Sequence, residues 1–165
     1  MIRTILHYPD PRLREKGEKV TALSPALLTL IDDMAETMYA APGVGLAATQ
    51  IGEAVSLFVI DISLEDEASD LKVFINPEIV FSEGTQLYEE GCLSFPGVTE
   101  EIKRSAKVRV KALDRDFEPF ELEAEGLLAV AIQHEYDHLI GRLMIDNVGP
   151  LRKRMMHRKM TKRAE

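Results

Sequence analysis

The sequence contains no tryptophan, a single cysteine and few aromatic residues, which make up 6% of its 165 positions. A single cysteine cannot form a disulfide within the chain, so the composition gives no sign of an oxidising compartment. No apolar run approaches the ~18 residues that a membrane-spanning helix requires. The first residues also lack the long apolar stretch and the small-residue cleavage site of a secretory signal. We therefore expect a cytoplasmic protein with no membrane segment.

Neither internal repeats nor low-complexity tracts nor flexible linkers interrupt the chain. Hydrophobic residues make up 45% of it and charged residues 29%, a composition typical of soluble globular proteins. A chain of this length can bury its own hydrophobic core without disulfides or a partner subunit. We therefore expect one domain over residues 1–165, and a monomer.

Acidic residues outnumber basic ones, but the two signs are unevenly distributed. The segment 152–165 contains seven basic residues and one acidic residue. It contributes +6 to the net charge of −8, which leaves −14 on the rest of the chain. Two interpretations are open: a basic segment that binds an anionic partner, or a solvated helix whose charges keep it soluble.

Three helices are predicted from the apolar periodicity and its boundaries. Ser24 is a good N-cap and Pro25 suits the first helical position, so the first helix covers 24–41. A second runs from about Gly126 to Ile140. A third, at about 150–163, carries the basic segment.

Short β-branched segments between the first two helices predict strands. They lie at 55–60, 73–75, 79–81 and 108–112. Asp114–Asp116 predicts a hairpin turn between strands at 108–113 and 117–122. Helix, strands and helix in this order indicate an α+β fold, in which antiparallel β-sheets pack around a central metal-binding helix with a C-terminal helix added.

The central predicted helix contains His134, Glu135 and His138, which form an H-E-x-x-H pattern. Residues four apart on a helix share a face, so both imidazoles can bind one cation while the glutamate reaches its bound water. The same face carries three apolar residues one and two turns earlier: Leu127, Val130 and Ala131. It therefore points into the protein, where buried histidines need partners. From the pattern alone, a bound metal and hydrogen bonds within the core are equally good explanations of how these histidines are satisfied.

A hydrolytic metal site normally has three protein ligands and an open position for water. The extended metalloprotease pattern fails here, since Met144 occupies the position of its third histidine. Asp146 is the nearest candidate downstream, and Cys92, which Gly91 precedes, is the candidate upstream. By itself a lone cysteine is more often an inert buried thiol. Beside the histidine pair, the thiolate becomes the preferred third ligand.

A third segment, Gly43–Gly52, combines small residues with an isolated glutamine, Gln50. Glycine patterns are weak signals, and alone this one predicts a tight turn after the first helix. It also fits a backbone that lies close to another group, with one amide presented to that group.

Together, these three segments resemble the signature motifs of peptide deformylases in sequence, order and separation. They read Gly43-x-Gly45-Leu46-Ala47-Ala48-x-Gln50, Glu90-Gly91-Cys92-Leu93-Ser94 and Gln133-His134-Glu135-x-Asp137-His138. The resemblance extends from about residue 2 to 150 and includes Tyr8–Leu13 and Leu113–Asp116. It implies a metal-dependent hydrolase that removes the formyl group from the N-terminal methionine of new bacterial proteins and releases formate.

The resemblance also implies a role for residues in each motif. Three residues would bind the metal: Cys92, His134 and His138. Glu135 would act as general acid and base, while the Gln50 amide and the Leu93 backbone N–H would bind the developing oxyanion. The backbone at Gly45 and Gly91 would hold the substrate peptide as an added strand. The family's methionine pocket maps onto Val44, Tyr88, Glu90, Leu127, Val130, Ala131 and His134.

Further features follow from the same resemblance. Arg104 would lie near the substrate entrance, and Glu90 and Asp137 are candidates for orienting the histidines. The family's native metal is Fe(II), and zinc, nickel or cobalt can occupy its site. A mixed nitrogen and sulfur ligand set suits several of these metals, so the ligands themselves do not choose among them.

Three residues depart from the family pattern. Phe95 follows Ser94 where bacterial members usually carry Val or Ile, Ala131 stands where a cysteine is frequent, and Tyr88 is large for a pocket rim. Every position assigned to catalysis is intact. The departures therefore bear on side-chain preference and leave the reaction unchanged.

Two other functions fit parts of the sequence. A small zinc endopeptidase would also carry H-E-x-x-H, but Cys92 as third ligand argues against it. A ribosome-associated binding protein would explain the basic segment, but its structural metal would usually have four ligands. The basic helix can also serve the enzyme, because bacterial relatives dock such a helix near the ribosomal exit tunnel, where RNA phosphates attract it. Removing 152–165 should then weaken ribosome binding and spare activity on short peptides.

Overall fold

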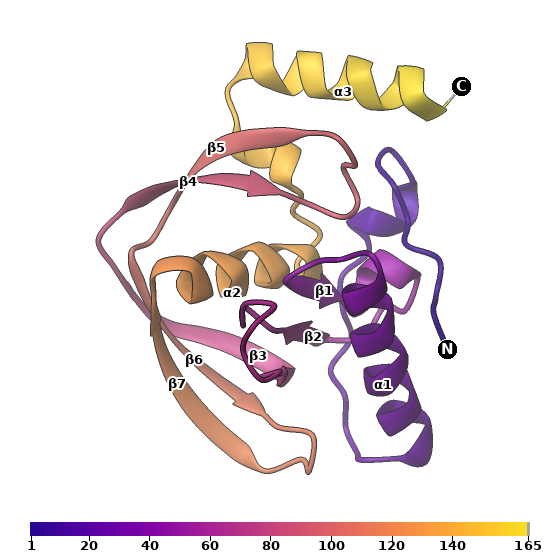
Figure 1. Cartoon of the computed structure of the whole chain (residues 1–165), viewed down its shortest axis with the longest axis vertical. Helices are drawn as coiled ribbons and strands as arrows, with labels where there is room; N and C mark the ends of the chain where they lie inside the picture. Colours follow the sequence, from indigo (N-terminus) through magenta and orange to yellow (C-terminus); the bar gives the residue numbers. More distant parts are fainter. Residues whose placement is uncertain (165) are drawn as a thin grey trace.

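The computed structural model describes residues 1–164, and Glu165 lies outside the described part. Its central element is α2 (Gly126–Leu139), with a two-stranded sheet on one side and a five-stranded sheet on the other (Figure 1). The five-stranded sheet has the order β1-β2-β3-β6-β7, and every pair in it is antiparallel. The predicted α+β arrangement of antiparallel sheets around a central helix is confirmed.

The strand bounds are as follows. The larger sheet contains β1 (Gly45–Ala47), β2 (Leu57–Ile60), β3 (Lys72–Glu83), β6 (Lys107–Leu113) and β7 (Pro119–Glu125). The smaller sheet pairs β4 (Gln86–Gly91) with β5 (Thr99–Arg104). Three short 3₁₀ turns connect elements: η1 (Pro11–Arg14), η2 (Ala48–Ile51) and η3 (Met144–Asn147).

The first predicted helix is α1 (Pro25–Ala40). The Ser24 hydroxyl accepts a hydrogen bond from the Leu27 N–H at 3.1 Å, which confirms the predicted N-cap. One face of α1 packs apolar side chains against β1 and β2: Leu27, Leu30, Ile31, Met34 and Met38. This packing anchors the turn after α1, which leads directly into β1 beside α2.

The two strands predicted at 73–75 and 79–81 are one continuous strand, β3. Between them, Asn76 has a φ of 52°, and its side chain hydrogen-bonds both the N–H and the C=O of Val20. The pairing of β3 with β6 shifts register between Ile75 and Glu78, a stretch that contains Asn76, and again between Ile79 and Phe81. These bulges let the strand continue past Asn76 and Pro77, residues that ordinarily interrupt a strand pattern.

The predicted hairpin at Asp114–Asp116 joins β6 to β7 and is confirmed, but its second strand begins at Pro119 instead of residue 117. Phe117 has a φ of 64° and its N–H donates to the Asp114 C=O, so it belongs to the turn. The Asp114 carboxylate accepts from the N–H groups of Asp116 and Glu118, which stabilises the longer turn.

Three strands, β1, β4 and β5, were not predicted from the sequence. Strand β1 is too short and too rich in small residues to show a strand pattern, and we expected a tight turn there. Strands β4 and β5 are mostly exposed, and Glu90, Ile102 and Arg104 are their buried residues. Because two of these three are charged, no apolar alternation marks the hairpin.

The C-terminal helix α3 (Pro150–Ala164) corresponds to the helix predicted at about 150–163. Met156 and Met160 are buried in a hydrophobic cluster that also contains Phe95 and Val98. The helix therefore packs on the segment between β4 and β5, above the central helix in Figure 1. Within residues 1–164, no helix combines the length and the apolar character needed to span a membrane.

Candidate metal centre

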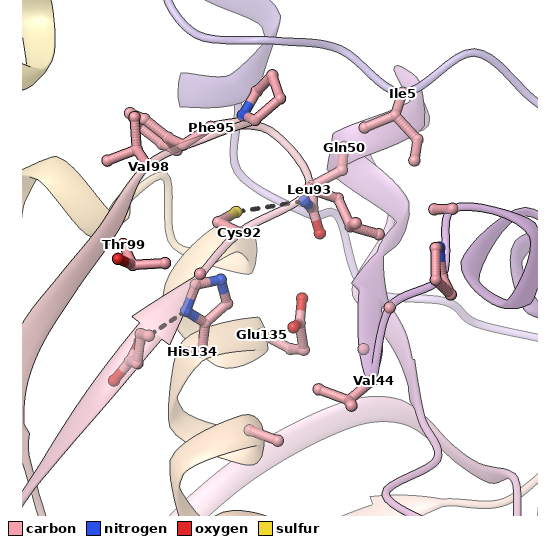
Figure 2. Close-up of a pocket in the computed structure, with 18 of the residues that line it drawn as sticks. Ile5, Val44, Gln50, Cys92, Leu93, Phe95, Val98, Thr99, His134 and Glu135 are labelled. Atoms are coloured by element: carbon pink, nitrogen blue, oxygen red, sulfur yellow. Dashed lines mark hydrogen bonds and ion pairs between the residues drawn. The ribbon is translucent and has the colours of Figure 1, made fainter. Parts of the chain in front are cut away.

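Three potential metal ligands converge where α2 meets the segment after β4. Cys92 follows β4, and His134 and His138 stand one turn apart on α2. Their ligand atoms lie within 4.8 Å of one another, and the Cys92 Sγ is 3.5 Å from the His138 Nε2. Figure 2 shows Cys92 and His134 facing the same space. Asp146, the other candidate third ligand, is not in this group, because its carboxylate pairs with Arg14.

The chemistry of the three donors fits a divalent cation, with positions left for water or substrate. Burial, together with the charge of His134, holds the pKa of His138 well below its usual value, which favours the neutral form that binds a metal. Burial also opposes charge on His134, but the neighbouring Cys92 and Glu90 outweigh it and raise its pKa. Binding a cation at this ring would therefore displace a proton.

A buried ion-pair network holds His134. The His134 Nδ1 is 2.9 Å from the Glu90 Oε1, which leaves the Nε2 of the ring for a cation. Arg104 donates to both oxygens of Glu90, from Nε at 2.8 Å and from Nη2 at 2.9 Å. Its Nη1 donates to Asp137 at 2.6 Å. The network therefore fixes the orientation of one ligand ring.

The position of Arg104 corrects the expectation that it lies near the substrate entrance. Its side chain is 6% exposed and is enclosed by Glu90 and Asp137, away from the cavity. The physical reason is that the buried carboxylate of Glu90 needs a cation beside it, and the partly buried Asp137 adds a second carboxylate on the other side of Arg104. Asp137 reaches Arg104 and Asn147, whereas Glu90 contacts a histidine directly. Of the two candidates for orienting the histidines, Glu90 is the one in contact.

Glu135 lies between the ligands and β1. It is 4% exposed, and its Oε1 has no hydrogen-bond partner among the residues that the structure describes. Burial raises the pKa of Glu135 to about 7. A carboxyl group with a pKa near neutrality can both accept and return a proton. Gly45 makes room for it, because a Cβ at that position would lie 2.6 Å from the Glu135 Oε2.

Gln50 presents its amide NH₂ to the same space. Its Oε1 accepts from the Ala47 N–H at 2.9 Å. The amide oxygen therefore faces Ala47, and the NH₂ group faces the potential ligands. The Nε2 donates to the Ser94 Oγ at 3.0 Å and lies 3.7 Å from the Cys92 Sγ (Figure 2). The next residue, Leu93, has no acceptor for its backbone N–H within residues 1–164. Two N–H donors therefore lie beside the three potential ligands: the Leu93 N–H, which has no partner within residues 1–164, and the Gln50 NH₂, which donates to Ser94 and Cys92.

A cavity of about 630 Å³ opens beside these groups. Figure 2 shows Val44, Gln50, Leu93 and Glu135 around it. Its lining includes eight of the nine residues predicted to bind substrate: Val44, Gly45, Tyr88, Glu90, Gly91, Leu127, Val130 and Ala131. All but Arg104 thus lie where substrate could reach them.

The motifs did not predict the outer wall of the cavity. Ile5 and His7 come from the N-terminal segment, which is attached where the Leu6 N–H donates to the Gln50 C=O at 2.7 Å. Val98 directly precedes β5, and Thr99 is the first residue of that strand. Contacts between segments so far apart in the chain leave no mark on a local pattern, so no signal in the single sequence could have revealed them.

Phe95, one of the departures from the family pattern, also lines the cavity. It is fully buried and stacks on Tyr8, with ring centroids 5.1 Å apart. Tyr8 in turn hydrogen-bonds His157 of α3 through its hydroxyl. The larger side chain is therefore accommodated by the N-terminal segment and lies beneath α3.

Comparison with known proteins decides the family. The family model described as polypeptide deformylase matches residues 2–154. This chain belongs to the polypeptide deformylase family. It is 51% identical over 159 residues to peptide deformylase 1 of Burkholderia multivorans, a match that covers 96% of this chain and 87% of the relative. It is 50% identical to the peptide deformylase of Syntrophobacter fumaroxidans, over 98% of this chain and 95% of the relative.

Solved peptide deformylase structures share the whole fold. The crystal structure of the enzyme from Legionella pneumophila has a TM-score of 0.93 and 49% identity, and covers 99% of this chain and 96% of its own. The enzyme from Ehrlichia chaffeensis in complex with actinonin has a TM-score of 0.93 and 33% identity, with 98% and 97% covered. The chain is therefore an enzyme, a metal-dependent hydrolase that removes the formyl group from the N-terminal methionine of new polypeptides. Neither the endopeptidase nor the non-enzymatic binding protein is needed to explain its motifs.

Proposed function

We propose that Glu135 carries the proton in the deformylation reaction, and that Cys92, His134 and His138 hold the metal. One observation carries this proposal: a buried glutamate with an unpaired oxygen stands between three converging ligands and a cavity. When bound there, a divalent cation would lower the pKa of water and polarise the formyl carbonyl.

Glu135 would take a proton from the water that attacks the formyl carbon. It would then give that proton to the departing amine nitrogen, so that the products are formate and a free methionine amine. Burial, which raises the pKa of Glu135 to about 7, suits a group that must accept a proton and then release it.

Gln50 and Leu93 would stabilise the negative charge that develops on the formyl oxygen. The Gln50 Nε2 and the Leu93 N–H both lie beside the ligands, and the Ala47 N–H holds the Gln50 amide in its orientation. Donors fixed before the reaction cost no reorganisation while charge develops, which makes them effective.

The substrate backbone would lie between β1 and β4. Among the residues that the structure describes, β1 is the edge of the larger sheet and β4 pairs with β5 alone, so each presents a free edge. Gly45 on β1 and Gly91 on β4 both line the cavity, and a peptide added there can hydrogen-bond to both edges. The methionine side chain, a flexible thioether, would pack beside Glu90 and His134 against five residues: Val44, Tyr88, Leu127, Val130 and Ala131.

We further propose that Fe(II) is the native metal and that zinc, nickel or cobalt can replace it. One thiolate and two imidazoles suit all four metals, and the resemblance to the family favours iron. Because thiolate and Fe(II) are both oxidisable, aerobic handling should reduce activity. Activity that never declines in air would argue against iron.

The basic face of α3 would dock on the ribosome, in the cytoplasm. Lys153 and Arg154 are exposed and could contact RNA phosphates. The structure changes how this should be tested, because deleting 152–165 would also remove the buried Met156 and Met160 from the core. Replacing Lys153 and Arg154 with glutamine leaves that core intact, and should weaken ribosome binding in a salt-dependent way. Ribosome binding equal to that of wild type would contradict the docking proposal.

The reaction itself can be tested with protein purified without air and loaded with Fe(II). Wild type should release formate from a formyl-Met-Ala peptide, whereas Glu135→Gln should lose about 1,000-fold in kcat while retaining its iron. Glu101→Gln on the exposed part of β5 is a matched control and should keep wild-type activity.

Two results would count against these proposals in different ways. An active Glu135→Gln variant would show that another group carries the proton. No formate from iron-loaded wild type would show that this chain has kept the fold and lost the family's chemistry.

A further inference from the structure

A second cavity of about 530 Å³ lies beside the first, between α3 and the start of β5. Three residues, Gly97, Val98 and Thr99, line both cavities. The second cavity, which we name the α3 groove, is completed by Glu100, Arg152, Met155, Met156, Arg158, Lys159 and Lys162. A chain that leaves the first cavity across residues 97–99 would therefore enter the α3 groove.

The charges of the α3 groove are strongly unbalanced. Four basic side chains line it against one carboxylate, that of Glu100. The Arg152 Nη1 lies 3.5 Å from the Glu100 Oε1, and the Lys159 Nζ donates to the Gly97 C=O at 2.9 Å. Within residues 1–164, Arg158 and Lys162 form no ion pair, so their charges are available to a ligand.

The remaining lining is apolar. Met155, 55% exposed, and the buried Met156 lie beside the cations, together with Val98. Apolar surface beside free cations suits an acidic side chain, whose methylene groups can pack while its carboxylate pairs. Outside 152–165 the chain carries a net charge of −14, so the α3 groove is a local exception on an acidic protein.

We propose that the α3 groove binds acidic side chains of the formylated polypeptide, downstream of its methionine. The inference rests on the proposed function, since it requires the methionine end to occupy the first cavity. Because residues 97–99 line both cavities, a single polypeptide can occupy the first cavity and the α3 groove together. This continuity favours the substrate chain over RNA, whose binding would not involve the first cavity. The groove thus gives the enzyme a preference among substrates that differ only beyond the methionine.

The test compares KM for formate release from three kinds of peptide. The first is formyl-Met-Ala-Ser. The second extends it with glycines and a pair of glutamates, and the third carries a pair of glutamines at the same positions. The pair is moved stepwise from the fourth to the seventh position of the peptide. The reach of an extended chain determines which of these positions lies in the α3 groove when the methionine occupies the first cavity. Wild type should show a KM about fivefold lower for the glutamate peptide than for its glutamine counterpart in at least one register, as expected for two exposed ion pairs. High salt should remove the difference.

Two double variants then locate the effect. Arg158→Gln with Lys162→Gln should abolish the preference for glutamate and leave formyl-Met-Ala-Ser unaffected. Lys153→Gln with Arg154→Gln removes the same charge from α3 outside the groove, and should keep the preference.

Each contrary outcome has a distinct meaning. Equal KM for glutamate and glutamine peptides in every register overturns the proposal, while formate release from formyl-Met-Ala-Ser still supports the proposed function. A groove variant that loses ribosome affinity but keeps the glutamate preference overturns it as well, and assigns Arg158 and Lys162 to RNA. No formate from any peptide is instead a failure of the proposed function.

Discussion

Glu90 and Arg104 form a buried ion pair with two hydrogen bonds, of 2.8 and 2.9 Å, directly behind His134, one of the three residues that we propose bind the metal. The pKa of Glu90 is lowered although its burial acts in the opposite direction, because Arg104 and His134 both hydrogen-bond its carboxylate. Arg104 is therefore a positioning residue: it fixes Glu90, which fixes the histidine ring.

Arg104→Ala should lower the free energy of unfolding by about 3–5 kcal/mol, because it leaves the buried Glu90 and the partly buried Asp137 without their cation. Metal affinity should fall about 10-fold to 100-fold, since His134 loses its orientation. Urea unfolding and competition with a chelator measure the two effects. Arg115→Ala is the matched control: Arg115 pairs with the exposed Asp32, so the variant should change stability by less than about 1 kcal/mol. Wild-type metal affinity in Arg104→Ala would refute the positioning role.

Gly45→Ala should lower kcat about 100-fold without unfolding the protein. The added methyl group would lie 2.6 Å from the Glu135 Oε2, so the carboxylate has to move away from the reacting atoms. Formate release and circular dichroism separate the loss of activity from a loss of structure. Gly149→Ala adds the same group where nothing lies within 4 Å and should behave as wild type. If Gly45→Ala keeps its kcat, the position of Glu135 is less critical than proposed.

The sequence alone predicts those parts of this fold whose signals are local. The Ser24 cap and the apolar spacing of α1 predict the first helix, and H-E-x-x-H places two histidines on one face of α2. The same is true of the hairpin at Asp114–Asp116. In each case a few neighbouring residues determine the structure, whatever packs against them.

Other parts could not be predicted because distant residues determine them. In the sequence, the strand pattern stops before Asn76, but the hydrogen bonds of Asn76 to Val20, 56 positions away, let β3 continue. Arg104 looks like an exposed base in a charged segment, yet it is buried because Glu90 and Asp137 come from other elements. The pattern of residues made Cys92 only the preferred third ligand, and the resemblance to the family strengthened that expectation.

The stability of the protein should fall in acid partly through Asp61. This carboxylate is 6% exposed and accepts from the Ser63 hydroxyl, the Tyr39 hydroxyl and the Asp70 N–H. Burial acts to raise the pKa of Asp61, but these hydrogen bonds outweigh it and lower the pKa. A lowered pKa stabilises the folded state above the unfolded value of about 3.9, and this contribution is lost as the pH falls through the folded value.

Asp61→Asn should therefore be less stable than wild type at pH 7, by about 1–3 kcal/mol, and the difference should shrink towards pH 2. Urea unfolding across this range measures it. The control Asp66→Asn changes an exposed carboxylate nearby and should follow the wild-type curve at every pH. A difference between Asp61→Asn and wild type that stays constant with pH would assign the effect to packing instead of charge.

Gln50→Leu should lower kcat about 100-fold to 1,000-fold and change KM little, because the Gln50 Nε2 would bind the oxygen mainly after it has gained charge. The variant also leaves the Ala47 N–H without its acceptor, so some stability is lost as well. Thr49→Val is the matched control, since Thr49 is equally buried and its hydroxyl makes only a long bond of 3.4 Å to the His138 C=O. Thr49→Val should keep most of its activity. A similar loss of kcat in both variants would mean that η2 matters for holding the backbone, and that the Gln50 amide has no special part in stabilising charge.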